Sequence, residues 1–306
     1  MGYPKNMSEF QDRFRTEEDC LAYLERIRWP DGFRCPACGG CESWRMQRGR
    51  HLCRSCRRQV SVTVGTVLQD TRKPLRQWLQ AIWHVTNQKQ GVSALGLQAA
   101  LGLGGYHTAW TWLHKLRRAM VRPGRDRLSG LVEVDEVFVG GEKSGKSGRG
   151  AMGKTLVLVA AQEVGPRKIG RIRLRRIPDA AMLSLHGAIE ECVEPGSTIR
   201  TDAWGGYNNL EMIGYAHRIA HKDASVGEDA LPLVNLVASL LKRWLLGTHQ
   251  GATQPSHLDY YLDEFTFRFN RRTSGSRGLL FYRLVEQTMA VGPWTEADIR
   301  GGYPTP

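Results

Sequence analysis

Two aspartates that end strand-like runs are the residues of this chain best suited to catalysis. Asp135 lies in the run Val-Glu-Val-Asp-Glu-Val-Phe-Val at 132–139, and Asp202 follows Thr-Ile-Arg-Thr at 198–201. A carboxylate at the end of a buried strand costs free energy unless a positive group meets it. Two of them in a chain rich in Arg and Lys predict a divalent-metal site that handles phosphate. One alternative stays open, because Asp202 could instead cap the stretch that begins at Trp204.

A helix expected over 231–246 would add a third ligand and a cation to that site. Asn235 and Lys242 are seven residues apart, which is two helical turns, so both project from almost the same face. An Asn carbonyl oxygen can bind magnesium, though more weakly than a carboxylate does. Two Mg²⁺ or Mn²⁺ ions held there would activate an attacking oxygen and stabilise the leaving oxygen at a phosphodiester. Lys242 would then hold a phosphate.

Two Cys-x-x-Cys pairs, separated by fourteen residues, predict a second metal site. Their members are Cys35, Cys38, Cys53 and Cys56. Pairs at this separation place four thiolates around one structural zinc ion at the tips of two hairpins. A pair of disulfides is the alternative, which a cytosolic location disfavours. Cys41 could compete as a ligand, but it has no paired partner.

The net charge of +13 is concentrated in the first part of the chain. Residues 1–130 hold 22 basic and 10 acidic residues, a balance of +12. Such an uneven distribution favours a polyanionic partner, and nucleic acid fits better than a membrane because no basic helix with a broad apolar face is present. The basic residues beside the cysteine pairs that favour DNA contact are Arg45, Arg48, Arg50, Arg54, Arg57 and Arg58.

A helix-turn-helix is expected after the cysteine-rich segment. Helices over 75–89, 93–101 and 106–122 are separated by a glycine-containing turn before the last of them. That last helix has an apolar face and a polar stripe that could enter a major groove, although any small helical bundle can show such a stripe. The stripe consists of His107, Thr111, His114, Lys115, Arg118 and Arg122.

The linker Arg-Pro-Gly-Arg at 122–125 marks the main domain boundary. After it the pattern changes to strands at 131–139, 155–162, 170–176 and 197–201, with helices at 179–191, 231–246 and 256–270. The domains expected are an N-terminal helical segment at 1–32, a zinc ribbon at 33–64, a helix-turn-helix at 73–122, a catalytic domain at 128–250 and a C-terminal helical extension at 251–306. The absence of a long apolar run and the polar start predict a cytoplasmic protein without a membrane segment.

Segments along nearly the whole chain carry a family resemblance. They are 23–36, Glu-Val-Asp-Glu at 133–136, Thr-Asp-Ala-Trp-Gly-Gly-Tyr at 201–207, Ser-Leu-Leu-Lys-Arg at 239–243, and 261–272. In them the chain resembles bacterial insertion-sequence transposases with an N-terminal zinc ribbon and a DDE-type catalytic domain. The resemblance implies a multidomain protein in which a zinc ribbon and helix-turn-helix precede an α/β ribonuclease-H-like domain with a mixed sheet.

The resemblance also assigns roles to the acidic residues. Asp135 and Asp202 match the first two metal-binding aspartates, and Lys242 matches the lysine of the family. The third ligand of the family is Glu, His or Asn seven residues before that lysine, which here is Asn235. The sequence departs from the His or Thr-rich stretch common around that ligand, since it reads Leu-Val-Asn-Leu-Val at 233–237. Two carboxylates just upstream are fallback ligands, namely Glu228 and Asp229.

The function implied is that of a DNA transposase. It would bind double-stranded terminal inverted repeats, nick them with water to expose a 3′-hydroxyl, and use that hydroxyl to attack target DNA. A homo-oligomer, most simply a dimer, is expected in the synaptic complex, in the bacterial cytoplasm near the nucleoid. Arg271 and Arg272 are further DNA-contact candidates. A DNA-binding regulator with an inactive nuclease-like domain is the alternative.

A phosphate-loop pattern, G-x-x-x-x-G-K-S at 140–147, offers a different hypothesis of ATP hydrolysis. That chemistry needs a helix that starts at the Lys-Ser pair. Gly-Arg-Gly at 148–150 opposes such a helix, so the loop and its Lys146 are expected to contact the DNA backbone instead.

Overall fold

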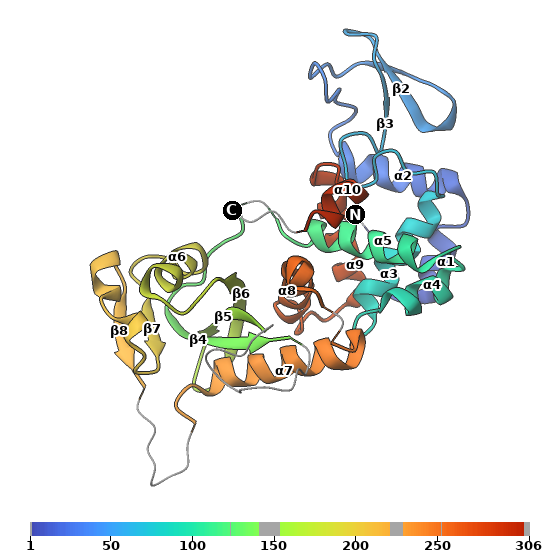
Figure 1. The fold of residues 1–306 in the computed structure, drawn as a ribbon. Coiled ribbons are helices and arrows are strands. Elements are labelled where there is room, and N and C mark those ends of the chain that lie inside the picture. Colours follow the sequence, from blue (N-terminus) through green and yellow to red (C-terminus); the bar gives the residue numbers. More distant parts are fainter. Residues whose placement is uncertain (1, 123, 141–153, 221–228, 252, 303–306) are drawn as a thin grey trace. The chain divides into compact units, whose positions relative to one another are not determined.

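The computed structural model divides the chain into two compact units (Figure 1). The residues that it describes are 2–122, 124–140, 154–220, 229–251 and 253–302. Unit 1 contains Met1–Arg122 and Thr273–Gly301, whereas unit 2 contains Pro123–Arg272 and Gly302–Pro306. Unit 2 is therefore inserted into the sequence of unit 1, and the C-terminal extension expected at 251–306 is shared between both units.

Unit 1 begins with two short helices and a small antiparallel sheet. Helix α1 (Met7–Arg13) precedes α2 (Glu17–Arg28), which starts at a capping box formed by Thr16 and Asp19. The sheet has the order β1-β2-β3 and carries a 3₁₀ turn, η1 (Gln47–Gly49), between its first two strands. Its strands are β1 (Ser43–Arg45), β2 (Arg50–Cys53) and β3 (Gln59–Ser61).

The remaining helices of unit 1 surround an aromatic core. They are α3 (Leu75–Asn87), α4 (Ala94–Leu101), α5 (Tyr106–Ala119), α9 (Arg277–Ala290) and α10 (Glu296–Arg300). Phe281 of α9 is fully buried, and its ring contacts Phe10, Phe14 and Trp83 at centroid distances of 5.7, 6.0 and 5.6 Å. A helix from the end of the chain thus completes the core of the N-terminal unit.

Unit 2 is built on a five-stranded mixed sheet of order β6-β5-β4-β7-β8. The strands are β4 (Leu131–Val139), β5 (Thr155–Glu163), β6 (Ile169–Ile177), β7 (Thr198–Thr201) and β8 (Ala216–Ile219). The first three form an antiparallel meander, whereas β7 pairs in parallel with β4 and β8 pairs in parallel with β7. This order and these directions define a ribonuclease-H-like sheet with β4 at its centre.

Helices cover both faces of this sheet, and each face has its own apolar core. Helices α7 (Pro232–His249) and α8 (Leu258–Phe269) pack on one face with side chains such as Val159 and Ile172, and the turn η4 (Pro255–His257) leads into α8. Helix α6 (Met182–Cys192) packs on the other face together with the turns η2 (Gly205–Tyr207) and η3 (Leu210–Ile213). Among the described residues, no helix is both long enough and apolar enough to cross a membrane.

Candidate catalytic and zinc sites

The two cysteine pairs of unit 1 form matching knuckles. The carbonyl oxygens of Cys35 and Cys53 accept hydrogen bonds from the N–H groups of Gly39 (2.9 Å) and Arg57 (3.0 Å). Both donor residues have positive φ angles, 74° and 60°, which closes each turn tightly around its sulfurs. The backbone N–H of Cys56 is the main cause that lowers the pKa of the Cys53 thiol, to about 6. Backbone N–H groups directed at a sulfur favour the thiolate that a metal requires, whereas the hydrogen bonds with the Cys56 and Cys53 thiols raise the pKa of Cys38.

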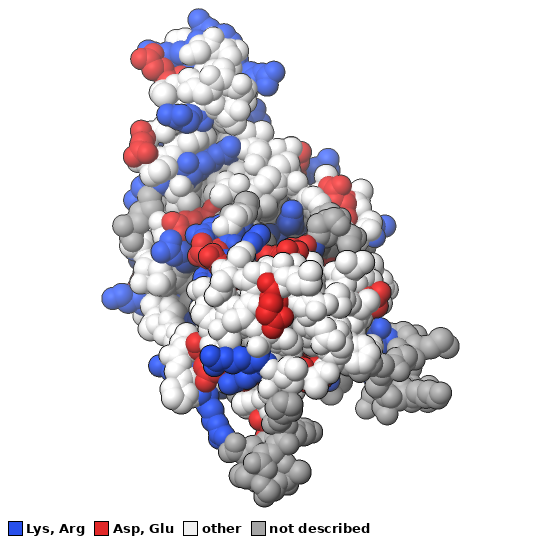
Figure 2. All heavy atoms as spheres, turned by 90° about the vertical axis from the view of Figure 1, so that its left-hand side faces the viewer, with Lys and Arg blue, Asp and Glu red and all other residues white. Residues whose placement is uncertain are grey.

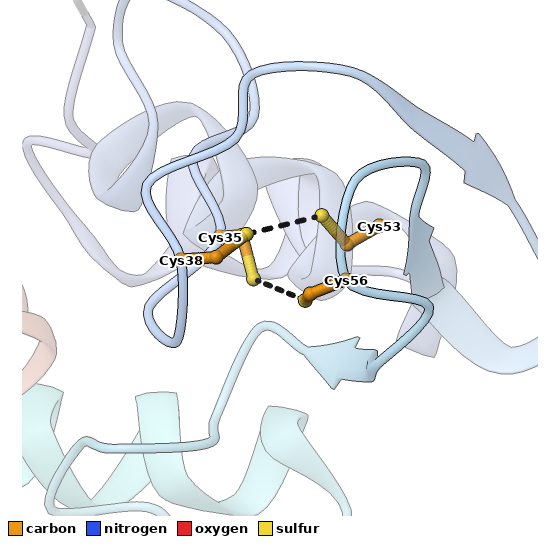
Figure 3. Close-up of side chains that lie close together, drawn as sticks. All are labelled: Cys35, Cys38, Cys53 and Cys56. Atoms are coloured by element: carbon orange, nitrogen blue, oxygen red, sulfur yellow. Dashed lines mark hydrogen bonds between the residues drawn. The ribbon is translucent and has the colours of Figure 1, made fainter.

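The four sulfurs of these knuckles converge, as Figure 3 shows. All of them lie within 4.8 Å of one another, with 3.7 Å between the Sγ atoms of Cys35 and Cys56 and 3.6 Å between those of Cys38 and Cys53. A tetrahedral site with Zn–S bonds of about 2.3 Å has sulfurs about 3.8 Å apart, so the cluster fits zinc. Cys41 lies outside this cluster, with its Sγ 3.7 Å from the carbonyl oxygen of Gly39.

The surface of the zinc ribbon is rich in exposed arginines, which lie at the top of the view in Figure 2. The six that the sequence singles out are all exposed, namely Arg45, Arg48, Arg50, Arg54, Arg57 and Arg58. The guanidinium groups of Arg54 and Arg57 lie 5.1 and 4.8 Å from the ring centroid of Trp44, itself 41% exposed. Cations gathered around an exposed aromatic ring suit contact with nucleic acid.

The polar stripe expected to enter a DNA groove lies partly inside unit 1. Thr111 is only 8% exposed and His114 is fully buried in α5. Neither side chain is exposed on the surface of unit 1, so Thr111 is less suited to contact a base edge than the exposed members of the stripe. Lys115 is half-buried, and this burial lowers the pKa of its ammonium group.

The C-terminal end of unit 1 contacts further residues of this stripe, although His107 stays exposed. Arg300 of α10 donates a hydrogen bond to Nε2 of His107 over 2.6 Å. The guanidinium of Arg118 lies over the ring of Trp294, 5.3 Å from its centroid. Helix α5 therefore packs against the C-terminal segment of its own unit on the face that was expected to read DNA.

In unit 2, Asp135 lies on β4 and Asp202 directly follows β7, the parallel neighbour of β4. The last paired positions of β4 and β7 are Glu133 and Arg200, and Asp135 and Asp202 each follow two residues later. Continuing this register would place the aspartates opposite one another, and parallel neighbours are about 4.8 Å apart. Asp135 is partly buried, and so is Asp202.

Asp135 lines an open pocket of about 280 Å³ between β4 and helix α7. Asn235 and Lys242 line the same pocket, with Ala238 and Ser239 between them on the same side of the helix. Asn235 and Lys242, seven residues apart, therefore lie on the same face of α7, and that face is turned toward the strand that carries Asp135.

Asp202 also has a local role in the turn that follows β7. Its Oδ1 accepts a hydrogen bond from the backbone N–H of Trp204 over 3.0 Å. Gly206 allows this turn to pack, because a Cβ there would lie 2.6 Å from the carbonyl oxygen of Ala180. Tyr207, at the end of this turn, packs on the sheet. The alternative interpretation of Asp202 as a turn residue is thus part of its structural role.

Tyr207 links the surroundings of both aspartates. Its hydroxyl donates to Oε2 of Glu136 over 2.6 Å, and its side chain is fully buried. Burial is the largest cause that raises the pKa of the Tyr207 phenol well above its usual value. The carboxylates that raise this pKa further are those of Glu136, Asp135 and Asp202.

The other predicted residues divide between structural roles and undescribed segments. The guanidinium of Arg272 donates to the carbonyl oxygens of Gly170 and Phe269, each over 3.0 Å, and so joins α8 to β6. The guanidinium carbon of Arg271 lies over the ring of Phe267, 4.0 Å from its centroid. Lys146 and Glu228 lie outside the residues that the structure describes, as does all of the phosphate-loop pattern except Gly140.

Family models and solved structures match parts of this chain. A model described as "ISXO2-like transposase domain" matches residues 127–270, and one described as "Transposase zinc-ribbon domain" matches residues 15–59. The catalytic core domain of BIV integrase matches with 15% identity and a TM-score of 0.34, over 50% of this chain and 94% of that chain. A simian T-cell lymphotropic virus intasome in complex with PP2A regulatory subunit B56 gamma matches with 15% identity and a TM-score of 0.33, over 60% of this chain and 70% of that chain. No curated protein matches.

The two family models together cover both parts of the chain that contain the candidate metal ligands. One includes the four cysteines, and the other includes the whole mixed sheet with Asp135, Asp202, Asn235 and Lys242. The chain therefore belongs to the transposases that combine an N-terminal zinc ribbon with a ribonuclease-H-like domain.

Proposed function

We propose that this transposase cleaves DNA at the terminal inverted repeats of an insertion sequence and joins the freed 3′ ends to target DNA. The observation that carries the proposal is the shared pocket of Asp135, Asn235 and Lys242. The register of β4 and β7 supports Asp202 as the fourth member, because it directs this residue toward the position opposite Asp135.

The residues present fit divalent cations with hard oxygen ligands. Two carboxylates and the Asn235 amide oxygen would hold two Mg²⁺ or Mn²⁺ ions, which prefer such ligands. Bound cations would activate the attacking oxygen and stabilise the leaving oxygen. The Lys242 ammonium would neutralise a non-bridging phosphate oxygen.

Each step exchanges one phosphorus–oxygen bond for another. Water attacks the phosphorus at the end of the element, the bond to the 3′ oxygen breaks, and a 3′-hydroxyl is released. That hydroxyl then attacks a target phosphodiester and displaces its 3′ oxygen. No covalent intermediate with the protein is required.

Recognition of the DNA would depend on unit 1. The exposed arginines of the zinc ribbon would bind phosphates of the double-stranded terminal repeat and of the target. Because two ends are processed together, we expect a homodimer in the synaptic complex. Retained candidates for further DNA contacts are His107, Lys115, Arg118, Lys146, Arg271 and Arg272.

The test is Mg²⁺-dependent nicking of a duplex that contains the end of the element. Asp135→Asn and Asp202→Asn should each abolish cleavage but leave binding of the same duplex intact. Glu211→Gln, a change at an exposed carboxylate of η3, should cleave like the unaltered protein. Undiminished cleavage by either aspartate variant would overturn the proposal. An unaltered protein that binds the duplex and never cuts it would instead favour a DNA-binding protein with an inactive nuclease-like domain.

A further inference from the structure

Glu133 is a buried carboxylate on the central strand, two residues before Asp135 and on the same side of β4. Its side chain is fully buried. Its Oε2 accepts hydrogen bonds from the backbone N–H groups of Leu233 over 2.8 Å and Val234 over 3.1 Å. These are the second and third residues of α7, so a residue of the sheet binds the N-terminus of that helix.

Among the described residues next to it in sequence, none caps the first N–H groups of α7, although Oδ1 of Asp229 accepts from the N–H of Leu231 over 3.2 Å. The residue at its N-cap position, Leu231, makes no side-chain hydrogen bond, and Pro232 at the first helical position has no N–H to donate. The first N–H groups of a helix have no partners within the helix. Glu133 satisfies two of them, and its negative charge also faces the positive end of the helix dipole.

The charge of Glu133 is balanced from the neighbouring strand. Nη2 of Arg200 donates to Oε1 of Glu133, and the same nitrogen donates to Oε2 of Glu163 over 2.9 Å. Glu133 and Arg200 are also directly paired positions of β4 and β7. Three elements therefore meet at one carboxylate, namely β4, β7 and α7.

Those three elements are the ones that carry the proposed catalytic residues. We propose that Glu133 is a positioning residue that sets the rotation and the depth of α7, so that Asn235 and Lys242 face Asp135. This inference rests on the proposed function. Asn235 directly follows Val234, and a helix turns about 100° and rises about 1.5 Å with each residue. A small slip of the first turn would therefore move the Asn235 oxygen away from Asp135.

The simpler alternative is that Glu133 only stabilises the fold, as many helix caps do. Glu133→Gln separates the two roles, because it keeps the size of the side chain but presents an NH₂ group to Arg200. With the cap weakened, kcat for Mg²⁺-dependent cleavage should fall about tenfold to a hundredfold, because a displacement of about 1 Å can cost up to about a hundredfold. The Mg²⁺ concentration for half-maximal activity should rise, while KM for the end duplex should stay within about twofold.

A matched control is available at the other main helix of the sheet. Oδ1 of Asp179 accepts from the N–H of Ala181 over 3.0 Å at the start of α6, which lies on the opposite face of the sheet. Asp179→Asn removes an exposed carboxylate from the start of a helix that carries none of the proposed catalytic residues, and should leave kcat and the Mg²⁺ requirement unchanged. All variants are compared well below their melting temperatures.

The outcomes distinguish this inference from the proposed function. If Glu133→Gln lowers only the melting temperature, with kcat and the Mg²⁺ requirement unchanged, Glu133 is merely structural and the inference is overturned. If Asp135→Asn cleaves DNA normally, the proposed function fails whatever Glu133 does. Should Glu133→Gln not fold, Glu133→Asp serves instead, since it keeps the charge beside Arg200 but withdraws the carboxylate from α7. It should show the same fall in kcat, and unchanged kcat would again reject the inference.

Discussion

The side-chain amide of Asn235 donates hydrogen bonds to both carboxylate oxygens of Asp229, over 2.7 and 2.9 Å. The nitrogen of this amide is thereby turned toward Asp229, so its oxygen is presented elsewhere. Since only the amide oxygen can bind a cation, Asp229 gives Asn235 the orientation that a metal ligand needs.

Removal of Asp229 should weaken metal binding at the proposed catalytic site. Asp229→Ala leaves the Asn235 amide free to rotate, and losses of such supporting partners typically cost about tenfold to a hundredfold in metal affinity or activity. A Mg²⁺ titration of DNA nicking should therefore show a higher half-saturating concentration. The exposed Glu211, changed to Gln, is the control that should not shift the titration. An unshifted titration for Asp229→Ala would exclude this orienting role.

Zinc should be required for the fold of the ribbon. Cys38→Ser removes one of four thiolates, and structural zinc sites of this type supply folding free energy directly. We expect about one zinc per chain in the unaltered protein by metal analysis, loss of that zinc in the variant, and weaker binding of the end duplex. Cys41→Ser should retain its zinc, because this thiol lies outside the cluster. Well under one zinc per chain in the unaltered protein would contradict the assignment.

The hydrogen bond from Tyr207 to Glu136 should contribute measurably to the stability of unit 2. Tyr207→Phe removes a buried bond to a charged acceptor, which is worth about 2 kcal/mol in the free energy of unfolding. Tyr215→Phe is a matched comparison, because its hydroxyl donates to a neutral acceptor, the carbonyl oxygen of Val193, over 2.9 Å. That change should cost about 1 kcal/mol. Equal losses in denaturant unfolding would argue against a special contribution of the charged acceptor.

The same tyrosine should make stability depend on pH in the alkaline range. The folded protein raises the pKa of Tyr207, so it binds the phenolic proton more tightly than the unfolded chain does. This contribution to stability is complete below the ordinary tyrosine pKa of about 10 and is lost as the pH rises above it. In Tyr207→Phe, the free energy of unfolding should therefore decline less steeply above pH 10. A decline as steep as that of the unaltered protein would show that other groups cause it.

Hydrophobic periodicity predicts the central strands and main helices of unit 2 closely. The strand expected at 131–139 is β4 (Leu131–Val139), and the helix expected at 231–246 is α7 (Pro232–His249). These elements are long and bury a continuous apolar face, which is the signal that a sequence carries best. The family matches confirm the predicted transposase family and the zinc ribbon.

The supporting residues of the site could not be predicted in the same way. Glu133 looks like an ordinary member of an alternating strand, and its partners Leu233 and Val234 are backbone donors a hundred residues away. Leu231 and Pro232 are a signal that was present, since neither side chain can cap the first N–H groups of α7, which then need another acceptor. Likewise, the stripe on α5 gave no sign that Trp294 and Arg300 would contact it.

The insertion of unit 2 within unit 1 has a consequence for how this protein is made. Phe281, whose ring contacts Phe10 and Trp83 in the core of unit 1, is synthesised only after the whole mixed sheet. A nascent or prematurely terminated chain therefore lacks a central part of the DNA-binding unit, even when every arginine of the ribbon is already present. A chain that contains α9 also contains the whole mixed sheet, so the aromatic core of unit 1 is complete only after unit 2 has been synthesised.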